Sequence, residues 1–271
     1  MIIVHDGRGH YDDFLATCVL IYKTNQRAVR TKVLSEHLEE KEFWVIDQGL
    51  SYDVELHNFD HHHIKEEICA FTMVLDYFYG KKYREAFPNL QFIEIYDSYG
   101  PKAAAKFAKV SEDSLSVIFN PICDCMIKLF SKINGEINDP FYSIMKEIGK
   151  TICEEIENCQ ENMRILEDNA QYYTFNDIKI LDITDCKVSE GFKIENLPTK
   201  EYCKINKLDV DVILTIDSRN NSGYRMISHN IDKIKFLPND KSHFCHNSGF
   251  LIAFNFFSDY KQILTNHIEK K

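Results

Sequence analysis

The stretch His57-Asn58-Phe59-Asp60-His61-His62-His63 places an aspartate directly before three consecutive histidines. Imidazole and carboxylate groups side by side are good ligands for a divalent transition metal. Polar and apolar residues alternate in the preceding segment 53–56, which predicts a short strand that carries the cluster to the rim of a sheet. The alternative interpretation is an exposed histidine run that belongs to no structured site.

The composition is ordinary for a soluble folded protein of one large or two modest domains: 271 residues, 44% hydrophobic and 27% charged. The chain contains no run of about 18 apolar residues, so we expect no membrane span. No basic segment precedes the apolar run at residues 2–4, which predicts a first strand instead of a secretion signal, and hence an intracellular, cytoplasmic location. The net charge of −10 argues against non-specific binding to a long duplex. It is compatible with a short nucleic acid or nucleotide held through metals and a few local cations.

Nine cysteines occur at irregular spacing, and no two of them form a Cys-x-x-Cys pair. A zinc ribbon or a thioredoxin-like motif is therefore not indicated. In a reducing compartment we expect most of these thiols to be small buried hydrophobic groups. Candidate ligands are thus sought among histidines and carboxylates.

Further candidate ligands follow two apolar runs that we predict to be buried strands. The run at residues 2–4 leads into a loop with His5, His10, Asp12 and Asp13, and the run at residues 43–46 ends at Asp47. Sites form at the carboxyl ends of strands in a twisted parallel sheet, which favours a joint site for these side chains. Carboxylates also suit the start of a helix, here the segment 14–22, so we expect either Asp12 or Asp13 to serve as a cap.

The rest of the chain divides into a helical and a strand-rich part. Apolar spacing predicts helices at 66–80, at 102–109, and from Pro140 onwards, the last being a long connector into a second unit. Asp97 precedes a break at Gly100, where it can be a turn residue or a further ligand. Strands are predicted at 178–183, 210–216 and 224–229, with a turn at 220–223 and a final helix capped by Ser258. We therefore predict two domains, residues 1–170 and 171–271.

Taken together, the motifs resemble the DHH phosphoesterase superfamily, and specifically its Myg exonuclease branch. The resemblance rests on His5-x4-His10-x-Asp12-Asp13, Asp47-x-Gly49, Tyr52-Asp53, Asp60-His61-His62 and the segment from Phe92-Ile93-Glu94 to Asp97, in that order. Further matches are Ser222-Gly223-Tyr224-Arg225 and Phe244-Cys245-His246-Asn247-Ser248-Gly249-Phe250. The resemblance implies an α/β fold: a DHH-type catalytic domain whose mainly parallel sheet is flanked by helices, and a smaller C-terminal α+β domain across a cleft.

The resemblance also implies a site for two divalent metal ions, for which we expect manganese, with magnesium or cobalt as alternatives. One ion would be held by His5, His10 and Asp47, and the other by Asp12, Asp47, His61 and Asp97, so that Asp47 bridges. His62 would contact the scissile phosphate instead of a metal, and the expected catalytic residues are His62, Asp47 and Asp12. In the second domain the expected substrate-binding residues are Arg225, His246, Asn247 and Gly249.

Three positions depart from the family pattern. Ser98-Tyr99-Gly100 stands where Asp-Asn-Gly is usual, and His63 stands where glutamine is usual. Leu251-Ile252-Ala253 follows Phe250 where the family commonly continues Ile-Gly-Gly. The two missing glycines remove positions at which the backbone can approach a substrate closely, which suggests a different substrate from that of the better-known members.

The leading hypothesis is a metal-dependent phosphodiesterase, a 3′-to-5′ exonuclease on short single-stranded RNA or DNA. Paired metal ions can lower the pKa of a shared water and stabilise the attacking and leaving oxygens of phosphoryl transfer. One alternative is a hydrolase of a small phosphate ester, such as a nucleotide, a cyclic dinucleotide or a pyrophosphate, which the acidic balance leaves open. Another is a catalytically silent binding module that keeps the fold. The oligomeric state is not readable from the sequence.

Overall fold

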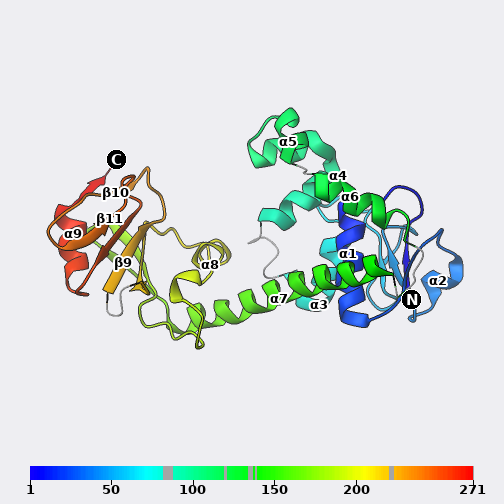
Figure 1. Cartoon of the computed structure of the whole chain (residues 1–271), viewed down its shortest axis with the longest axis horizontal. Coiled ribbons are helices and arrows are strands. Elements are labelled where there is room, and N and C mark those ends of the chain that lie inside the picture. Colours follow the sequence, from blue (N-terminus) through cyan, green and yellow to red (C-terminus); the bar gives the residue numbers. More distant parts are fainter. Residues whose placement is uncertain (82–87, 119–120, 134–136, 138, 220–222, 271) are drawn as a thin grey trace. The chain divides into compact units, whose positions relative to one another are not determined.

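The chain folds into two compact units, unit 1 (Met1–Ile156) and unit 2 (Glu157–Lys271), shown in Figure 1. The computed structural model describes residues 1–81, 88–118, 121–133, 137, 139–219 and 223–270. The division falls inside helix α7 (Pro140–Asn169), which therefore starts in unit 1 and ends in unit 2. From the sequence we place the boundary at residue 170, where this helix ends.

Unit 1 contains a five-stranded sheet in the order β2-β1-β3-β5-β4. Its strands are β1 (Ile2–Val4), β2 (Ala28–Arg30), β3 (Trp44–Ile46), β4 (Tyr52–Asp53) and β5 (Asn58–Phe59). All neighbours run parallel except β4 and β5, which pair antiparallel. Every residue of β1 and β3 is buried, as expected for parallel strands covered on both faces. The predicted mainly parallel sheet is confirmed.

The strand that carries the histidine cluster is β5, and the prediction of a strand at 53–56 is wrong. Residues 54–57 form a turn between β4 and β5. The Asp53 carboxylate accepts hydrogen bonds from the backbone N–H groups of Glu55 at 2.9 Å and Leu56 at 3.1 Å. An aspartate that bonds the backbone two or three residues further on closes a turn, and here this local preference prevails over the alternating pattern.

Helices α1 (Tyr11–Thr24), α2 (Ser35–Glu39) and α3 (Ala70–Tyr79) contact this sheet. Helices α4 (Pro88–Ala108) and α6 (Pro121–Phe130) pack against α1, and α5 (Glu112–Ile118) packs against α4. Helices α1 and α3 lie side by side (Figure 1) and both contribute to the main apolar core. Helix α3 begins four residues later than predicted and ends, as predicted, at Gly80, whose φ is 75°.

Helix α4 is kinked at Gly100, which has a φ of 80° and is followed by Pro101. The kink separates Asp97 from the segment 102–109, which we predict to be a short exposed helix. The segment is helical up to Ala108 and mostly exposed, but Ala104 and Ala105 depart from the prediction because they are buried in a small apolar cluster with helix α5. Alanine suits an exposed helix and a closely packed one equally well, so the composition could not distinguish them.

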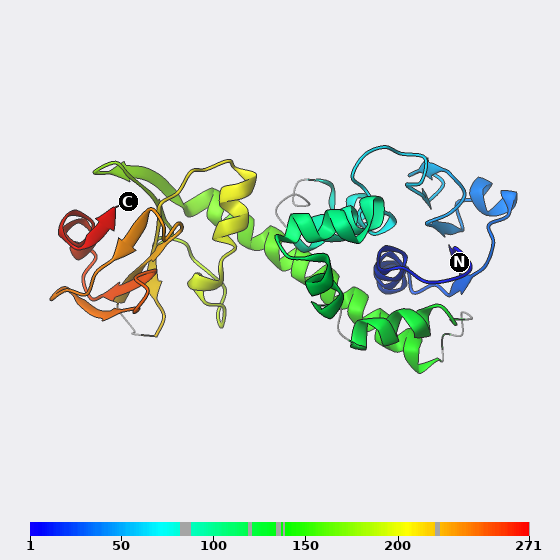
Figure 2. The same cartoon turned by 90° about the horizontal axis from the view of Figure 1, so that it is seen from above.

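Helix α7 approaches α1 closely at Gly149. A Cβ atom at this position would lie 2.0 Å from the carbonyl oxygen of Cys18 in α1, so only glycine fits. The Tyr142 hydroxyl donates a hydrogen bond to the backbone oxygen of Gln26, at 2.8 Å, and anchors the same helix beyond the end of α1. Figure 2 shows α7 as one continuous helix.

Unit 2 is built on a six-stranded mixed sheet in the order β11-β12-β9-β8-β7-β6. Its strands are β6 (Gln171–Phe175), β7 (Ile178–Asp182), β8 (Val212–Asp217), β9 (Gly223–Ser228), β11 (Ser242–Cys245) and β12 (Leu251–Phe254). Among the described residues of this sheet, β7 and β8 pair in parallel and every other neighbouring pair is antiparallel. The remaining elements are the 3₁₀ helix η2 (Ile194–Asn196), α8 (Thr199–Ile205), α9 (Asp259–Asn266) and the pair β10 (Ile234–Phe236) and β13 (Ile268–Lys270).

Two local predictions for unit 2 have different outcomes. Residues 220–222 of the predicted turn lie outside the described residues, although β8 and β9 pair antiparallel as that turn requires. Ser258 precedes α9 as predicted, but its side chain makes no capping hydrogen bond.

Two expectations drawn from the composition concern the burial of the cysteines and the absence of a membrane-spanning segment. All nine cysteines belong to the described residues; none of them is in a disulfide, and six are buried. Within the described ranges, no helix is both long enough and apolar enough to cross a membrane.

Candidate metal centre

The loop after β1 and the first turn of α1 hold a group of polar side chains. Asp13 Oδ1 accepts a hydrogen bond from the backbone N–H of His10, at 2.8 Å, and so caps α1. Asp13 Oδ2 lies 2.8 Å from His5 Nε2 and 2.9 Å from Arg30 Nη1. The predicted cap is therefore Asp13, which leaves Asp12 for another role.

Asp47 follows β3 and stands at the centre of the cluster. Its backbone has a φ of 58°, a left-handed conformation that costs on the order of 1 kcal/mol and tends to occur at functional sites. Its carboxylate oxygens lie 3.5 Å from His5 Nε2, 3.9 Å from His10 Nδ1 and 3.3 Å from His61 Nε2. His62 Nδ1 lies 3.6 Å away, so this one buried carboxylate is within 4 Å of four imidazoles and could contribute to a metal site.

Asp60 orients His62. It is fully buried, and its oxygens accept hydrogen bonds from the backbone N–H of Leu50 at 2.7 Å and from the backbone N–H and Nδ1 of His62 at 3.0 and 2.6 Å. Burial alone would raise the pKa of Asp60, but these hydrogen bonds lower it. Both oxygens are thus engaged, so Asp60 positions its neighbour instead of offering a free ligand. His63 is exposed.

Asp97 reaches the cluster from α4, where its Oδ2 lies 2.9 Å from His61 Nε2. Burial lowers the pKa of His61, but hydrogen bonds to Asp47 and Asp97 outweigh it and raise the pKa to about 10. An imidazole must be neutral at the nitrogen that ligates a metal, so metal binding at this nitrogen would release its proton.

Asp12 is the least compensated group of the cluster. It is 1% exposed, and within the described part of the chain neither carboxylate oxygen has a hydrogen-bond partner. Burial raises the pKa of Asp12 well above its ordinary value, and the carboxylates of Asp47 and Asp97 raise it further. A buried carboxylate without a partner is costly unless a cation compensates it. The side chains present therefore fit a divalent metal ion.

Three overlapping sets of ligand atoms each lie within 4.8 Å of one another: His5, His10 and Asp47; Asp47, His61 and His62; and His10, Asp12 and Asp97. All of the residues predicted as metal ligands belong to these sets. The grouping differs from the expected one because Asp12 and Asp97 fall together with His10 and apart from Asp47. It also includes His62, which we expected to contact phosphate. Since His62 Nδ1 lies 2.6 Å from Asp60, that nitrogen is engaged in a hydrogen bond.

Two positioning residues, Arg30 and Asp60, were not predicted to act in this way. Arg30 follows from no motif, because it reaches Asp13 only through the pairing of β2 beside β1. Asp60 was visible in the sequence as part of the histidine cluster. Its role depends on Leu50, ten residues away, whose backbone N–H engages one carboxylate oxygen.

The residues predicted to bind substrate lie in unit 2. Arg225 in β9 is buried, whereas His246 and Asn247, between β11 and β12, are exposed. Gly249 has a φ of 73°, and a Cβ atom there would lie 2.7 Å from the backbone oxygen of Phe236 in β10. Packing of the loop against β10 therefore accounts for this glycine.

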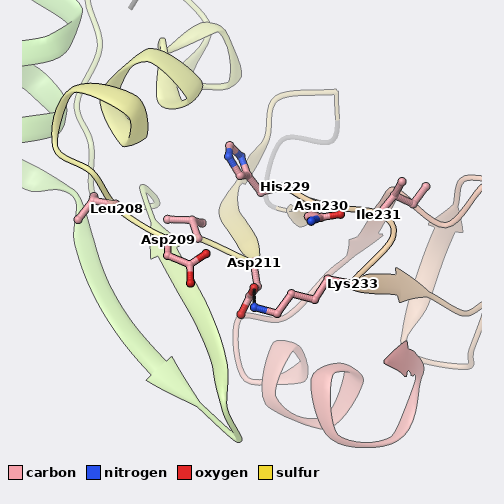
Figure 3. A pocket seen from close by; sticks show the side chains of 8 residues that line it. Leu208, Asp209, Asp211, His229, Asn230, Ile231 and Lys233 are labelled. Atoms are coloured by element: carbon pink, nitrogen blue, oxygen red, sulfur yellow. Dashed lines mark ion pairs between the residues drawn. The ribbon is translucent and has the colours of Figure 1, made fainter. Parts of the chain in front are cut away.

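Unit 2 also contains a pocket of about 420 Å³, drawn in Figure 3. Asp211 and Lys233 form an ion pair of 2.5 Å within it, and Asp209 pairs with Lys179 at its edge. Lysines thus balance the charge of these two carboxylates, whereas the carboxylate of Asp12 has no such cation among the described residues. This pocket lacks the uncompensated negative charge of a metal centre.

The family model of the MYG1 exonucleases, described as an uncharacterised protein family (UPF0160), matches residues 1–179. This range contains all the candidate metal ligands and the whole of α7. A comparison with curated proteins gave no match. Since the family model covers 179 of the 271 residues, the chain belongs to the MYG1 exonuclease family, the Myg branch of the DHH phosphoesterases.

Proposed function

We propose that this chain is a metal-dependent phosphodiesterase, a 3′-to-5′ exonuclease that releases nucleotides from short single-stranded RNA or DNA. The observation that carries the proposal is the buried, uncompensated carboxylate of Asp12 beside His10 and Asp97. The name of the family supports it, because an exonuclease acts on nucleic acid.

In this proposal one divalent ion is held by His5, His10 and Asp47, and a second by Asp12, Asp47, His61 and Asp97. Manganese is the proposed metal, since mixed imidazole and carboxylate ligands suit it, and magnesium or cobalt are possible substitutes. The ions, when bound, would supply a water of lowered pKa and stabilise charge on the phosphoryl oxygens. The Nδ1 of His5 donates a hydrogen bond to the backbone oxygen of Asp6 at 2.6 Å, which leaves Nε2 facing Asp47, and partners of this kind generally orient the ligands of metal sites.

His62 is the residue that we assign to the scissile phosphate. Its side chain is 52% exposed, so a substrate can reach it. With Nδ1 engaged by Asp60, Nε2 is the nitrogen left to donate to a phosphate oxygen. A hydrogen bond from Nε2 would stabilise the negative charge that develops on the phosphoryl group.

In unit 2 the proposed substrate-binding residues are Arg225, His246, Asn247 and Gly249. The exposed side chains of His246 and Asn247 can donate hydrogen bonds to a phosphate or a sugar. Gly249 can contribute only its backbone.

A second candidate is a hydrolase of a small phosphate ester. A pocket of about 700 Å³ beside the cluster has the size of a small-molecule site, and the net charge of −10 disfavours long polyanions. Turnover that increases with the number of nucleotides favours the exonuclease, whereas highest turnover on a mononucleotide or a cyclic dinucleotide favours the ester hydrolase.

The direct test is a time course with a 5′-end-labelled short single-stranded RNA and manganese. We expect a ladder that shortens one nucleotide at a time from the 3′ end and disappears with a chelator. His61→Ala should abolish the ladder, and the matched control His63→Ala, which alters an exposed neighbour, should keep it. Absence of any cleavage by a protein that retains its metal would contradict the proposal.

A further inference from the structure

The pocket of about 700 Å³ in unit 1 opens directly beside the candidate metal centre. His10, Asp12 and Asp97 line it, and the same three residues form one of the ligand sets. A molecule in this pocket would therefore touch the centre itself. Helices α1, α4 and α6 and the loop before α1 supply the wall.

Much of that wall is aromatic or aliphatic. Phe92 and Tyr96 stand one turn apart on α4, with ring centroids 6.1 Å apart and planes inclined by 33°. Tyr11 from α1 and Ile127 from α6 complete this part of the lining. Aromatic faces of this kind bind nucleobases by stacking, because every base has a π face.

Two exposed charged side chains line the same pocket. Arg8 belongs to the loop between Gly7 and Gly9, and the Gly9 N–H anchors this loop by donating to Ser131 Oγ at 2.9 Å. Asp124 stands in the first turn of α6. A guanidinium suits a phosphate, whereas a carboxylate suits a base edge that presents N–H groups.

We propose that this pocket binds the base of the nucleotide whose phosphate lies at the metal centre, and that Asp124 gives it a preference for guanine. Guanine presents two adjacent N–H donors, on N1 and N2, which match the two oxygens of one carboxylate. Adenine and cytosine place an acceptor nitrogen beside their amino group, and uracil flanks its single N–H with two carbonyl oxygens, so a carboxylate repels part of each edge. The inference rests on the proposed function for the position of the phosphate.

Calorimetric titration of the full chain, in manganese, with guanosine, adenosine, cytidine and uridine 5′-monophosphates tests the pocket without requiring hydrolysis. A bidentate contact to a base discriminates by about fivefold to a hundredfold, so we expect the guanosine nucleotide to bind tighter by a factor in that range. Asp124→Asn replaces one acceptor oxygen by a donor and should reduce the preference to about twofold or less. Asp113 is a matched acid in the first turn of α5 that does not line the pocket, so the control variant Asp113→Asn should retain the preference for the guanosine nucleotide.

Stacking predicts a second effect that does not depend on the base. Phe92→Ala should lower the affinity for all four nucleotides by about tenfold or more, because it removes an aromatic face. Unchanged affinity in this variant would overturn the assignment of the base to this pocket. Equal affinity of the wild-type protein for the four nucleotides, or a guanine preference that survives Asp124→Asn, would overturn the role of Asp124.

The two proposals can fail separately. Selective binding of the guanosine nucleotide by a chain that cleaves no phosphodiester would support the pocket and contradict the exonuclease. Degradation of RNA by a chain that binds the four nucleotides equally would support the exonuclease and overturn the guanine pocket.

Discussion

Replacement of Asp12 by asparagine should stabilise the metal-free protein. The two oxygens of Asp12 are buried and unpartnered within the described residues, and other carboxylates surround them. Asparagine keeps the shape of the side chain and removes its charge. An unsatisfied buried group costs about 1–3 kcal/mol, and more if it is charged. Because the amide would also lack a partner, we expect a gain of about 1 kcal/mol in the free energy of unfolding of the metal-free variant.

Bound metal should make the wild-type protein more stable than the Asp12→Asn variant. A ligand present at 100 times its Kd stabilises a protein by about 2.7 kcal/mol, and a hundredfold weaker affinity reduces that gain to about 0.4 kcal/mol. For a unit the size of Met1–Ile156, each kcal/mol shifts the unfolding midpoint by about 2–4 °C. Manganese should therefore raise the wild-type midpoint by about 5–11 °C and that of Asp12→Asn by only about 1–2 °C.

Circular dichroism melts in chelator and in manganese measure both effects. Asp6→Asn is a suitable control, because it neutralises an exposed acid of the same loop that belongs to no ligand set among the described residues. A lower midpoint of Asp12→Asn in chelator, together with an unchanged manganese shift, would refute the assignment of Asp12 as a ligand.

Three further predictions concern other parts of the chain. His62→Ala should keep its metal content and lower kcat by about 10²- to 10³-fold, because it removes a phosphate contact and no ligand; wild-type turnover in a steady-state assay would contradict the role. Gly149→Ala should destabilise the protein by about 1–3 kcal/mol in denaturant unfolding, because its Cβ would lie 2.0 Å from the Cys18 oxygen, whereas the exposed control Thr151→Ala should change little. The hydrogen bond from Arg219 lowers the pKa of Asp217 below its ordinary value of 3.8, so this pair stabilises the fold above that pH and loses its contribution as the pH falls through the folded pKa. The stability difference between wild type and Asp217→Asn should accordingly shrink in acid, and a difference independent of pH would refute this explanation.

The candidate ligands that come directly after a strand could be predicted from the sequence. His5 follows β1, Asp47 follows β3, and His61 comes two residues after β5. These strands are parallel neighbours, so their carboxyl ends share one edge of the sheet and their following residues meet there. For His5 and Asp47 the short apolar run before the residue is enough to predict this placement, whereas β5 before His61 was not predicted.

Contacts made between elements could not be predicted in the same way. Asp97 joins the cluster from a helix, so its proximity to His61 depends on how α4 packs, which no local pattern reports. Arg30 depends likewise on the pairing of β2 with β1. The wrong strand at 53–56 has a local cause, since the Asp53 side chain closes a turn where the alternation of polarity suggested an extended segment.

The manganese stoichiometry of the purified full chain is the measurement that tests the central claim most directly. Metal analysis after dialysis, combined with electron paramagnetic resonance, counts the ions and reports whether they are coupled. We predict two coupled manganese ions per wild-type chain and a loss of both the coupling and most of the metal in Asp47→Ala, because Asp47 belongs to two of the ligand sets. A wild-type chain that binds no ion, or an Asp47→Ala variant that retains a coupled pair, would contradict the account.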